Sequence, residues 1–426
     1  MLPHFGDMRL TDMLFMSYAE RAAHIVWPFA ACDLWTFEEF VRLIEDAYGS
    51  QWRDPAITPL RELEKDLHVL ELFHGPTLAF KDCALQGLGR LVSHGLNRRG
   101  KKIAMLTATS GDTGSATMAA FANLDNVDAF VMFPKGRVSE FQRRQMTTMT
   151  APNVHAIEIL GTFDDCQDIA KALQLPSANS INFFRPALQI AYYFEAVLQV
   201  MKRTGAARVN VAVPSGNFGN MYAAICAKLE GLPIDLLIAG TNKNRMVANF
   251  IRHGVFESGV VEGTWSPSMD IQVASNLERL AFDLVGRDSA LIRMHYAGTS
   301  FIVDRERMRS LGLRADWTDE EGCLRTIRAI NREYGYVIDP HTAHAMSAAL
   351  RLRGENTSPT VVLATAAPVK FGEAMKEALG VAPALPAEFA DIYERTERVE
   401  TLDKDSESVR EYINKKLHEL NRGFSV

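Results

Sequence analysis

Short apolar runs alternate with longer stretches of helical spacing over most of the 426-residue chain. Runs rich in β-branched side chains predict buried strands at residues 101–108, 128–134, 154–160, 208–214, 235–241 and 360–366. Between them, apolar residues three and four apart predict helices at 113–124, 139–149, 185–203 and 219–230. Such alternation is typical of parallel sheets with helices on both faces, so the expected fold class is α/β.

The same pattern divides the chain into four consecutive segments. A break near residues 175–182, followed by a second cluster of strands, predicts two parallel-sheet α/β units. Residues 255–340 mix helical spacing with irregular stretches, and the charged tail ends in an amphipathic helix. The expected domains are a mainly helical segment at 1–70 with a break at WPFAA (27–31), a first α/β unit at 71–180, a second at 181–385 and a charged helical tail at 386–426.

Composition indicates a large core and excludes several classes of partner. Hydrophobic residues make up 47% of the chain, which is enough for more than one domain. The net charge of -6 implies no broad basic surface for nucleic acid, so an anionic ligand requires a local basic pocket. The five scattered cysteines form no CxxC pair, which predicts a protein without disulfides or structural zinc. No signal peptide or membrane span is evident, so the expected location is the cytoplasm. The choice between a monomer and a homodimer stays open.

Lys81 stands out within the stretch HGPTLAFKD (74–82) because it follows the apolar pair Ala79 and Phe80. Burial beside such neighbours disfavours the charged form of a lysine. Two interpretations are open. Either the side chain reaches water while its stem is buried, or the chain uses a neutral amine as a nucleophile or base.

Two glycine-rich turns each follow a predicted strand and open a predicted helix. They read TSGDTGS (109–115) and PSGNFGN (214–220). Glycine allows close approach of the backbone to a ligand, and the following helix directs free N–H groups and a positive dipole end at an anion. Ligands of α/β sheets bind at these carboxyl ends of strands. Each turn therefore suits a phosphate or a carboxylate, and the alternative is a capped turn that binds nothing.

Signatures of several other ligands and reactions are missing. The chain has no GxxxxGK[ST], no GxGxxG turn, no HExxH and no GxSxG. An amine together with two anion-binding turns fits pyridoxal phosphate instead. The phosphate of this carbonyl cofactor would occupy one turn, and the other would hold the carboxylate of an amino acid.

Several longer motifs resemble the threonine synthase family in its long, bacterial and fungal form. They are HGPTLAFKD (74–82), TATSGDTGSAT (107–117), NSINFFR (179–185), VPSGNFGN (213–220), SPSMDIQ (266–272) and DPHTA (339–343). The resemblance spans about residues 60–380, with the motifs in the family's order. It implies the fold-type II, tryptophan-synthase β-like fold of pyridoxal-phosphate enzymes, with the cofactor in the cleft between two α/β units.

The resemblance also implies a role for each matching residue. Lys81 would form the imine with pyridoxal 5′-phosphate, and Thr365 would hydrogen-bond the pyridine nitrogen. The cofactor phosphate would be held by Gly216, Asn217, Phe218, Gly219 and Asn220. The substrate would be held by Ser110, Asp112 and Thr113 near its carboxylate, and by Ser180, Asn182, Arg185 and Lys370 at its phosphate. For Lys370 an ordinary ion pair is the alternative.

The reaction implied by the resemblance is a step of threonine biosynthesis. A lyase of this kind converts O-phospho-L-homoserine and water to L-threonine and phosphate, by γ-elimination and β-addition. Lys81 would serve as the general base at Cα and later at Cβ. The expected partner is therefore a small phosphorylated amino acid.

Three positions depart from the usual pattern of the family. Asn220 stands where the family has aspartate, Arg245 replaces an acid in GTNKNR (240–245), and Ala367 replaces a histidine in TAAPVKF (365–371). The family's opening segment is also short here. These changes leave open a threonine-synthase-like enzyme specialised for another β- or γ-replacement or elimination on an amino acid. A cofactor-binding protein without catalysis is a third interpretation, which the intact Lys81 and both glycine turns disfavour.

Overall fold

The protein is represented by a computed structural model that describes residues 10–296 and 300–420. Its chain forms two compact units, each assembled from three separate stretches of sequence. Unit 1 comprises Met1–Ala30, Asp54–His74 and Pro186–Pro383, and unit 2 comprises Ala31–Arg53, Gly75–Arg185 and Ala384–Val426. The sequence predicts consecutive domains instead, because a pattern along the chain does not show where the chain crosses from one unit to the other.

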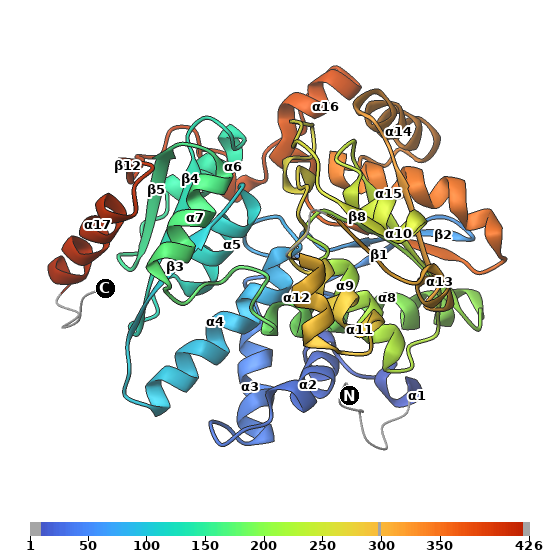
Figure 1. Ribbon diagram of the computed structural model, residues 1–426, viewed down its shortest axis with the longest axis horizontal. Helices are drawn as coiled ribbons and strands as arrows, with labels where there is room; N and C mark the ends of the chain where they lie inside the picture. The colour runs from blue at the N-terminus through green and yellow to red at the C-terminus, as the bar shows by residue number, and fades with distance from the viewer. Residues whose placement is uncertain (1–9, 297–299, 421–426) are drawn as a thin grey trace. The chain divides into compact units, whose positions relative to one another are not determined.

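Unit 2 contains a four-stranded parallel sheet in the order β12–β5–β4–β3 (Figure 1). Its strands are β3 (Ile103–Ala108), β4 (Val127–Pro134), β5 (Val154–Leu160) and β12 (Val399–Asp403). The first three confirm strands that the apolar runs predict. The sequence does not predict β12, because this edge strand exposes much of its polar sequence VETLD.

The helices of unit 2 enclose the core of this sheet. They are α3 (Phe37–Ala47), α4 (Lys81–Arg98), α5 (Asp112–Phe121), α6 (Glu140–Thr147), α7 (Phe163–Leu173), α17 (Ser406–Glu419) and the short η4 (Ala387–Phe389). Phe130 and Ile157 of the sheet pack with Cys166 of α7 and Ile413 of α17, and α7 and α17 lie side by side (Figure 1). The amphipathic helix predicted at the end of the charged tail is therefore confirmed, with its apolar side buried.

Unit 1 contains a six-stranded sheet in the order β1–β2–β11–β6–β7–β10. Its strands are β1 (Leu60–Glu64), β2 (Leu67–Glu71), β6 (Val209–Pro214), β7 (Ile234–Thr241), β10 (Leu313–Trp317) and β11 (Thr360–Ala364). The β1–β2 hairpin is antiparallel and all other neighbours are parallel. Strands β6, β7 and β11 confirm the prediction. Charged residues interrupt LRELE in β1 and LRADW in β10, so the apolar pattern does not predict these two edge strands.

Helices cover both faces of the sheet in unit 1 (Figure 1). One face packs against α14 (Glu320–Tyr334), α15 (Pro340–Leu352) and α16 (Gly372–Leu379), and the other against α8 (Phe184–Thr204) and α9 (Gly219–Leu229). The remaining elements are α1 (Leu10–Met13), α2 (Tyr18–Ala30), α10 (Met246–His253), α11 (Leu277–Leu284), α12 (Ser289–Tyr296), α13 (Arg305–Ser310), β8 (Val255–Glu257), β9 (Ser300–Ile302), η1 (Pro267–Met269), η2 (Arg353–Glu355) and η3 (Pro368–Phe371).

The structure confirms all four predicted helices and corrects one predicted break. The helices expected at 113–124, 139–149, 185–203 and 219–230 are α5, α6, α8 and α9. The break expected at WPFAA is wrong, because α2 continues through Pro28 to Ala30. Ile25, Val26 and Ala30 are buried, so packing of the helix outweighs the cost of proline near its end.

Candidate active site

The loop before Lys81 is fixed by its own side chains. Lys81 begins α4, and the Asp82 carboxylate accepts hydrogen bonds from the Thr77 backbone N–H and the Thr77 hydroxyl, both at 2.8 Å. A Cβ at Gly75 would lie 2.5 Å from the Cβ of Asp82, so this position has no room for a side chain. Leu78 has a φ of 62°, a backbone conformation that is uncommon outside glycine. A strained, tightly bonded loop therefore presents the lysine.

The amine of Lys81 lies inside unit 2 and not in open solvent. Its side chain is 11% exposed, and Nζ is 3.8 Å from Oδ2 of Asp112. Nζ also lies 5.9 Å from the centroid of the Phe80 ring. The side chain of Lys81 is therefore enclosed and does not extend into solvent, and the buried carboxylate beside it is a partner for its charged form.

Arg53 holds the same loop from the other side. Its guanidinium donates to the carbonyl oxygen of Gly75, pairs with Glu388, and lies 5.6 Å from the centroid of the Phe389 ring. Glu388 and Phe389 belong to η4, so the C-terminal stretch of unit 2 supports the turn that precedes Lys81. No motif in the sequence indicates this role, because an isolated arginine 22 positions from its partner gives no pattern.

Replacing Arg53 with methionine is expected to lower kcat by roughly tenfold and to change KM little, because a loosened loop misplaces the lysine without removing a substrate contact. Steady-state kinetics with O-phospho-L-homoserine would measure both constants. Arg42→Met, at an exposed arginine in the same stretch of unit 2, is the matched control. A variant at Arg53 with unchanged kcat would contradict this role.

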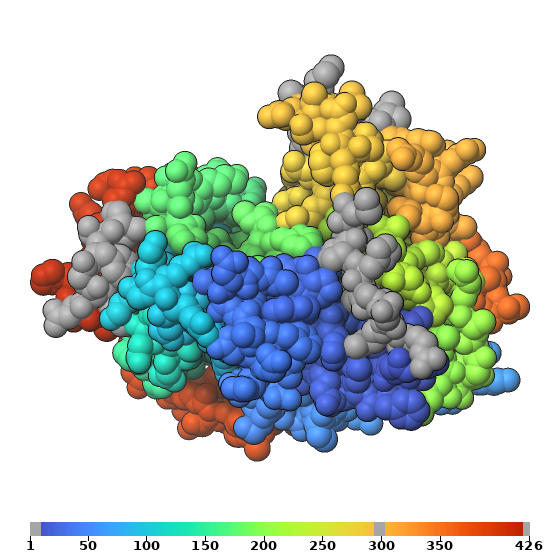
Figure 2. All heavy atoms as spheres, turned by 90° about the horizontal axis from the view of Figure 1, so that it is seen from below, coloured from blue at the N-terminus to red at the C-terminus, as the bar shows by residue number. Residues whose placement is uncertain are grey.

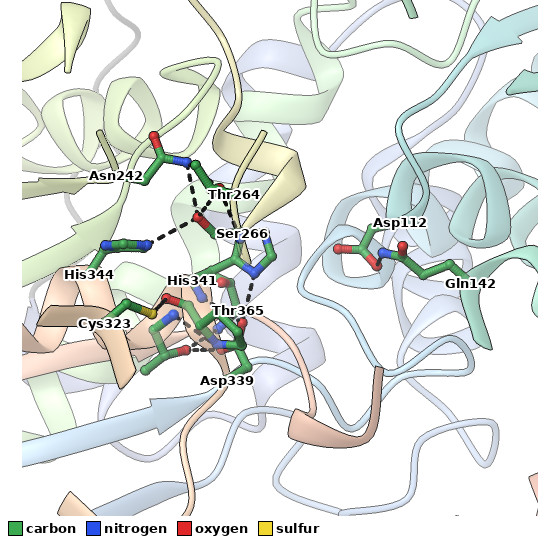
Figure 3. Close-up of polar contacts among 12 residues, drawn as sticks. Asp112, Gln142, Asn242, Thr264, Ser266, Cys323, Asp339, His341, His344 and Thr365 are labelled. Atoms are coloured by element: carbon green, nitrogen blue, oxygen red, sulfur yellow. Dashed lines mark hydrogen bonds and ion pairs between the residues drawn. The ribbon is translucent and has the colours of Figure 1, made fainter. Parts of the chain in front are cut away.

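The TSGDTG turn follows β3 and opens α5, as the sequence predicts. Gly111 has a φ of 134°, and a Cβ there would lie 2.5 Å from Oε1 of Gln142. The Nε2 of Gln142 donates to Oδ1 of the buried Asp112 at 2.8 Å (Figure 3). Ser110 and Thr113, which flank Gly111 and Asp112 in the sequence, are half-buried.

A second segment of unit 2 reaches the same end of β3. The N–H of Ala178 donates to Oγ1 of Thr107, and the side chain of Asn179 donates to the carbonyl oxygen of Ala108 at 2.9 Å. Ser180, Asn182 and Arg185 follow directly, and the guanidinium of Arg185 is buried and donates to the carbonyl oxygen of Ala178 at 2.7 Å. Because both segments are tied to the carboxyl end of β3, all the substrate residues predicted in unit 2 gather at one edge of its sheet.

The SGNFGN turn of unit 1 follows β6 and opens α9. Phe218 has a φ of 65° and caps the helix without a side-chain hydrogen bond. The first bond of the helix runs from the N–H of Tyr222 to the carbonyl oxygen of Phe218 at 2.9 Å, so the N–H groups of Gly219, Asn220 and Met221 have no acceptor inside the helix. This geometry fits an anion such as phosphate.

The same turn is held in place by close contacts on its other side. Oδ1 of Asn217 accepts from the N–H of Ser275 at 2.7 Å, and a Cβ at Gly216 would lie 2.6 Å from the carbonyl oxygen of Ser268. Gly216 therefore permits the turn to touch η1. The motif SPSMDIQ in the sequence includes this contact.

Asn220 is a buried residue at the start of α9. Its Oδ1 accepts hydrogen bonds from the hydroxyls of Tyr192 and Tyr193, and its Nδ2 has no hydrogen-bond partner within the described residues. An aspartate would accept the same two bonds. The asparagine therefore keeps the contacts with both tyrosines and replaces one negative oxygen with a donor.

Thr365 lies at the end of β11 in a buried polar cluster of unit 1 (Figure 3). Its N–H donates to Oγ1 of Thr342 at 3.3 Å, and Thr342 in turn contacts Asp339. Nδ1 of His341 lies 2.8 Å from Oδ2 of Asp339. The fully buried Lys370 follows in η3. The motif DPHTA thus supports the strand end that carries Thr365, which sequence reasoning does not reveal.

A second polar network lies at the end of β7 in unit 1. Nδ2 of Asn242 donates to Ser266 at 3.0 Å and to Asp270 at 2.8 Å, and Oγ of Ser266 lies 3.1 Å from Nε2 of His344 (Figure 3). Burial raises the pKa of Asp270 and lowers the pKa of His344 to about 3. The network fixes the segment that contacts the SGNFGN turn.

His344 stays neutral in the folded protein down to about pH 3, whereas in the unfolded chain it takes up a proton near pH 6.5. Acid therefore favours the unfolded state. This histidine is expected to lower the free energy of unfolding by about 2 kcal/mol between pH 7 and pH 5. His344→Gln should reduce that pH dependence in urea unfolding, whereas His418→Gln, at an exposed histidine, should leave it unchanged. An equal pH dependence in all three proteins would contradict the assignment.

The two other departures from the family pattern lie at the edge of this region. Arg245 is exposed at the start of α10, and its guanidinium carbon is 4.7 Å from the centroid of the Trp317 ring. It stacks on that surface ring and pairs with no acid within the described residues. Ala367 is buried just before η3.

Two kinds of feature are absent from the described residues. In the ranges 10–296 and 300–420, no group of three or more His, Cys, Asp and Glu side chains is placed to hold a metal ion. None of the helices described combines the length and the apolar character that crossing a bilayer requires.

Comparisons with known proteins identify the family. The family model described as "Pyridoxal-phosphate dependent enzyme" matches residues 53–366, and the one described as "Threonine synthase, C-terminal" matches residues 342–413. The chain is 42% identical to threonine synthase of Pseudomonas aeruginosa, over 97% of this chain and 91% of that protein. The chain belongs to the threonine synthase family. The threonine synthase of Escherichia coli is 35% identical over 92% of this chain.

Solved structures of this family share the fold. Pyridoxal-phosphate-bound threonine synthase from Brucella melitensis superposes with a TM-score of 0.89 at 39% identity, covering 97% of this chain and 92% of that one. Threonine synthase from yeast gives a TM-score of 0.91 at 32% identity, covering 98% of this chain and 92% of that one. The fold-type II assignment made from the sequence is therefore confirmed.

Proposed function

We propose that the protein is a pyridoxal-phosphate-dependent threonine synthase, which converts O-phospho-L-homoserine and water to L-threonine and phosphate. The observation that carries this function is the enclosed amine of Lys81, 3.8 Å from the carboxylate of Asp112 in a loop of restricted conformation. A lysine in such surroundings suits covalent and proton-transfer chemistry. The substrate class follows from membership of the threonine synthase family.

Several residues would hold the cofactor. Lys81 would bind its aldehyde carbon, the N–H groups of Gly219 and Asn220 would donate hydrogen bonds to its phosphate, and the Thr365 hydroxyl would donate a hydrogen bond to its ring nitrogen. Gly216, Asn217 and Phe218 shape the phosphate turn. The free N–H groups at the start of α9, next to the unpartnered Nδ2 of Asn220, fit this anion. Pyridoxal phosphate, when bound, supplies an electron sink that stabilises negative charge at the α and β carbons of an amino acid.

The side chains of unit 2 would bind the substrate and move its protons. Ser110 and Thr113 would hydrogen-bond the carboxylate, and Nζ of Lys81 would take the proton from Cα. Asp112 would stabilise the protonated amine from its position 3.8 Å away. Gln142 orients this carboxylate through its hydrogen bond to Oδ1.

The phosphate of the substrate requires cationic partners. Arg185 offers a buried guanidinium at the edge where Ser180 and Asn182 also lie, and Lys370 offers a buried ammonium in η3. Arginine binds phosphate with two parallel hydrogen bonds, and lysine acts as a point charge. These four residues would hold the leaving phosphate while the bond to Cγ breaks.

A specialised relative acting on another amino acid is the second candidate, and Ala367 and Asn220 motivate it. Arg245 gives it no support, because its side chain stacks on Trp317 at the surface. Asn220 retains the two tyrosine contacts of an acid. These observations favour the threonine synthase reaction.

We further propose that the protein is cytoplasmic, which its five free thiols support. We also propose that it acts as a monomer or homodimer.

The function is tested by supplying O-phospho-L-homoserine to the holoenzyme and measuring phosphate release together with the amino-acid product. Equal amounts of phosphate and L-threonine are expected. Phosphate release with a 2-oxo acid as the product would indicate elimination without β-addition. O-phospho-L-serine as a better substrate would favour the specialised relative.

A further inference from the structure

Unit 1 carries a surface groove that the proposed reaction does not use. It has a volume of about 550 Å³ and is formed by the end of α10, by α13, by the start of β10, by the last residue of α15 and by η2. Ile251, Leu313, Ala315 and Leu352 supply apolar walls. Figure 2 shows the gold to orange segment around α13 at the surface of this unit.

The groove lies at the opposite end of the sheet from the candidate active site. The residues proposed to bind cofactor follow the carboxyl ends of β6 and β11, whereas the groove begins at Leu313, the first residue of β10, which runs parallel to β7. Parallel strands have their starts at one edge and their carboxyl ends at the other. A ligand in the groove would therefore occupy a separate site.

The charge of the groove is opposite to that of the chain. Its lining includes Arg252, His253, Arg305, Arg309 and Arg314, against the single acid Glu355. With the histidine neutral, the lining carries a formal excess of three positive charges, whereas the whole chain carries -6. Burial lowers the pKa of the neighbouring Lys228, the Asp235 carboxylate raises it, and the charges of Arg208 and Arg314 lower it again by smaller amounts.

Two of the four guanidiniums remain available for a ligand. Arg252 pairs with Asp316 at 3.0 Å and Arg314 with Glu355 at 2.7 Å. Arg305 and Arg309 have no acid within ion-pair distance in the part of the chain that the structure describes, and they stand one helical turn apart on α13.

The stem of Arg305 lies close to Gly254. Gly254 ends α10 with a φ of 75°, and a Cβ there would lie 2.9 Å from Cγ of Arg305. The stem of this arginine therefore lies across the glycine at the rim of the groove. Arg305 and Arg309 are both exposed, so a ligand can reach their guanidiniums from solvent.

We propose that this groove binds a small organic diphosphate of the nucleoside diphosphate class, as an effector separate from the substrate. Arg305 and Arg309 would grip the phosphates with paired hydrogen bonds, and the apolar walls would receive the organic part. The volume suits a ligand of this size.

The site is tested by titrating the holoenzyme with ADP and, separately, with inorganic pyrophosphate in a calorimeter. Saturable binding of one ADP per chain is expected. Arg305→Gln/Arg309→Gln should weaken it by about a hundredfold, because each charged hydrogen bond contributes about tenfold. The exposed Arg332→Gln on α14 is the control and should bind as the parent does.

The double variant should keep its basal rate of threonine formation, since neither arginine belongs to the active site. Absence of ADP binding, or equal affinity in the parent and the double variant, would overturn the proposal. If pyrophosphate binds as tightly as ADP, the apolar walls do not bind the organic part of the ligand, and that part of the proposal is overturned. These outcomes do not depend on the substrate, so they are distinct from a failure of the proposed reaction.

Discussion

Lys81→Ala is expected to abolish threonine formation, with a loss of about 10⁴-fold or more in kcat. The side chain supplies both the amine that binds the cofactor and the base at Cα, and its Nζ lies 3.8 Å from Oδ2 of Asp112. Phosphate release and threonine production would fall together, because both depend on the first proton transfer. Stopped assays over hours with high enzyme concentration would measure the residual rate.

Lys102→Ala is the matched control for this substitution. Lys102 is an exposed lysine of the same unit, ahead of β3, so its removal should leave kcat within about twofold. Circular dichroism and the urea midpoint of both variants show whether the fold is intact. A folded Lys81→Ala protein that retains a tenth of the parent rate would refute the role of this amine.

Gly216→Ala is expected to weaken cofactor binding by on the order of a hundredfold. The added methyl would lie 2.6 Å from the carbonyl oxygen of Ser268 and 2.8 Å from Cα of Met269, and both are backbone atoms that cannot rotate away. The turn must therefore move relative to η1, and its N–H groups would lose their alignment on the phosphate. Titration of the apoprotein with pyridoxal phosphate, followed by absorbance, would give the dissociation constant.

Gly263→Ala provides a comparison for the same chemical change in the same unit. A Cβ at Gly263 meets no atom within 4 Å, so cofactor affinity should stay at the parent value. If Gly216→Ala binds the cofactor as tightly as Gly263→Ala does, the turn tolerates the shift and does not hold the phosphate as proposed.

Much of the fold follows from the apolar pattern, because buried parallel strands are continuous apolar runs. Strands β4 and β5 are examples, and nearly every position in them is buried. The edge strands β1 and β12 carry charged residues on exposed positions, so no local pattern distinguishes them from loops. The sequence predicts two α/β units, but the stretches that make up each unit were beyond local patterns, since residues 31–53 pack with stretches far away in the sequence.

The candidate site was predictable where chemistry is concentrated in short motifs. The glycines of both turns and Lys81 lie in such stretches, and the structure gives Gly111 a φ of 134° and Gly216 a backbone contact that leaves no room for a side chain. The supporting residues were not predictable. Arg53 reaches its loop across the fold, and His344 gains its significance from complete burial, which a sequence pattern alone does not specify.

The central claim is that a covalent bond joins the cofactor to Nζ of Lys81. Reduction of the holoenzyme with borohydride, followed by digestion and mass spectrometry, would locate the pyridoxyl group on one peptide. The predicted result is a single label on Lys81, within the peptide that contains HGPTLAFKD. A label on Lys370 or on any other lysine, with Lys81 unmodified, would contradict the claim.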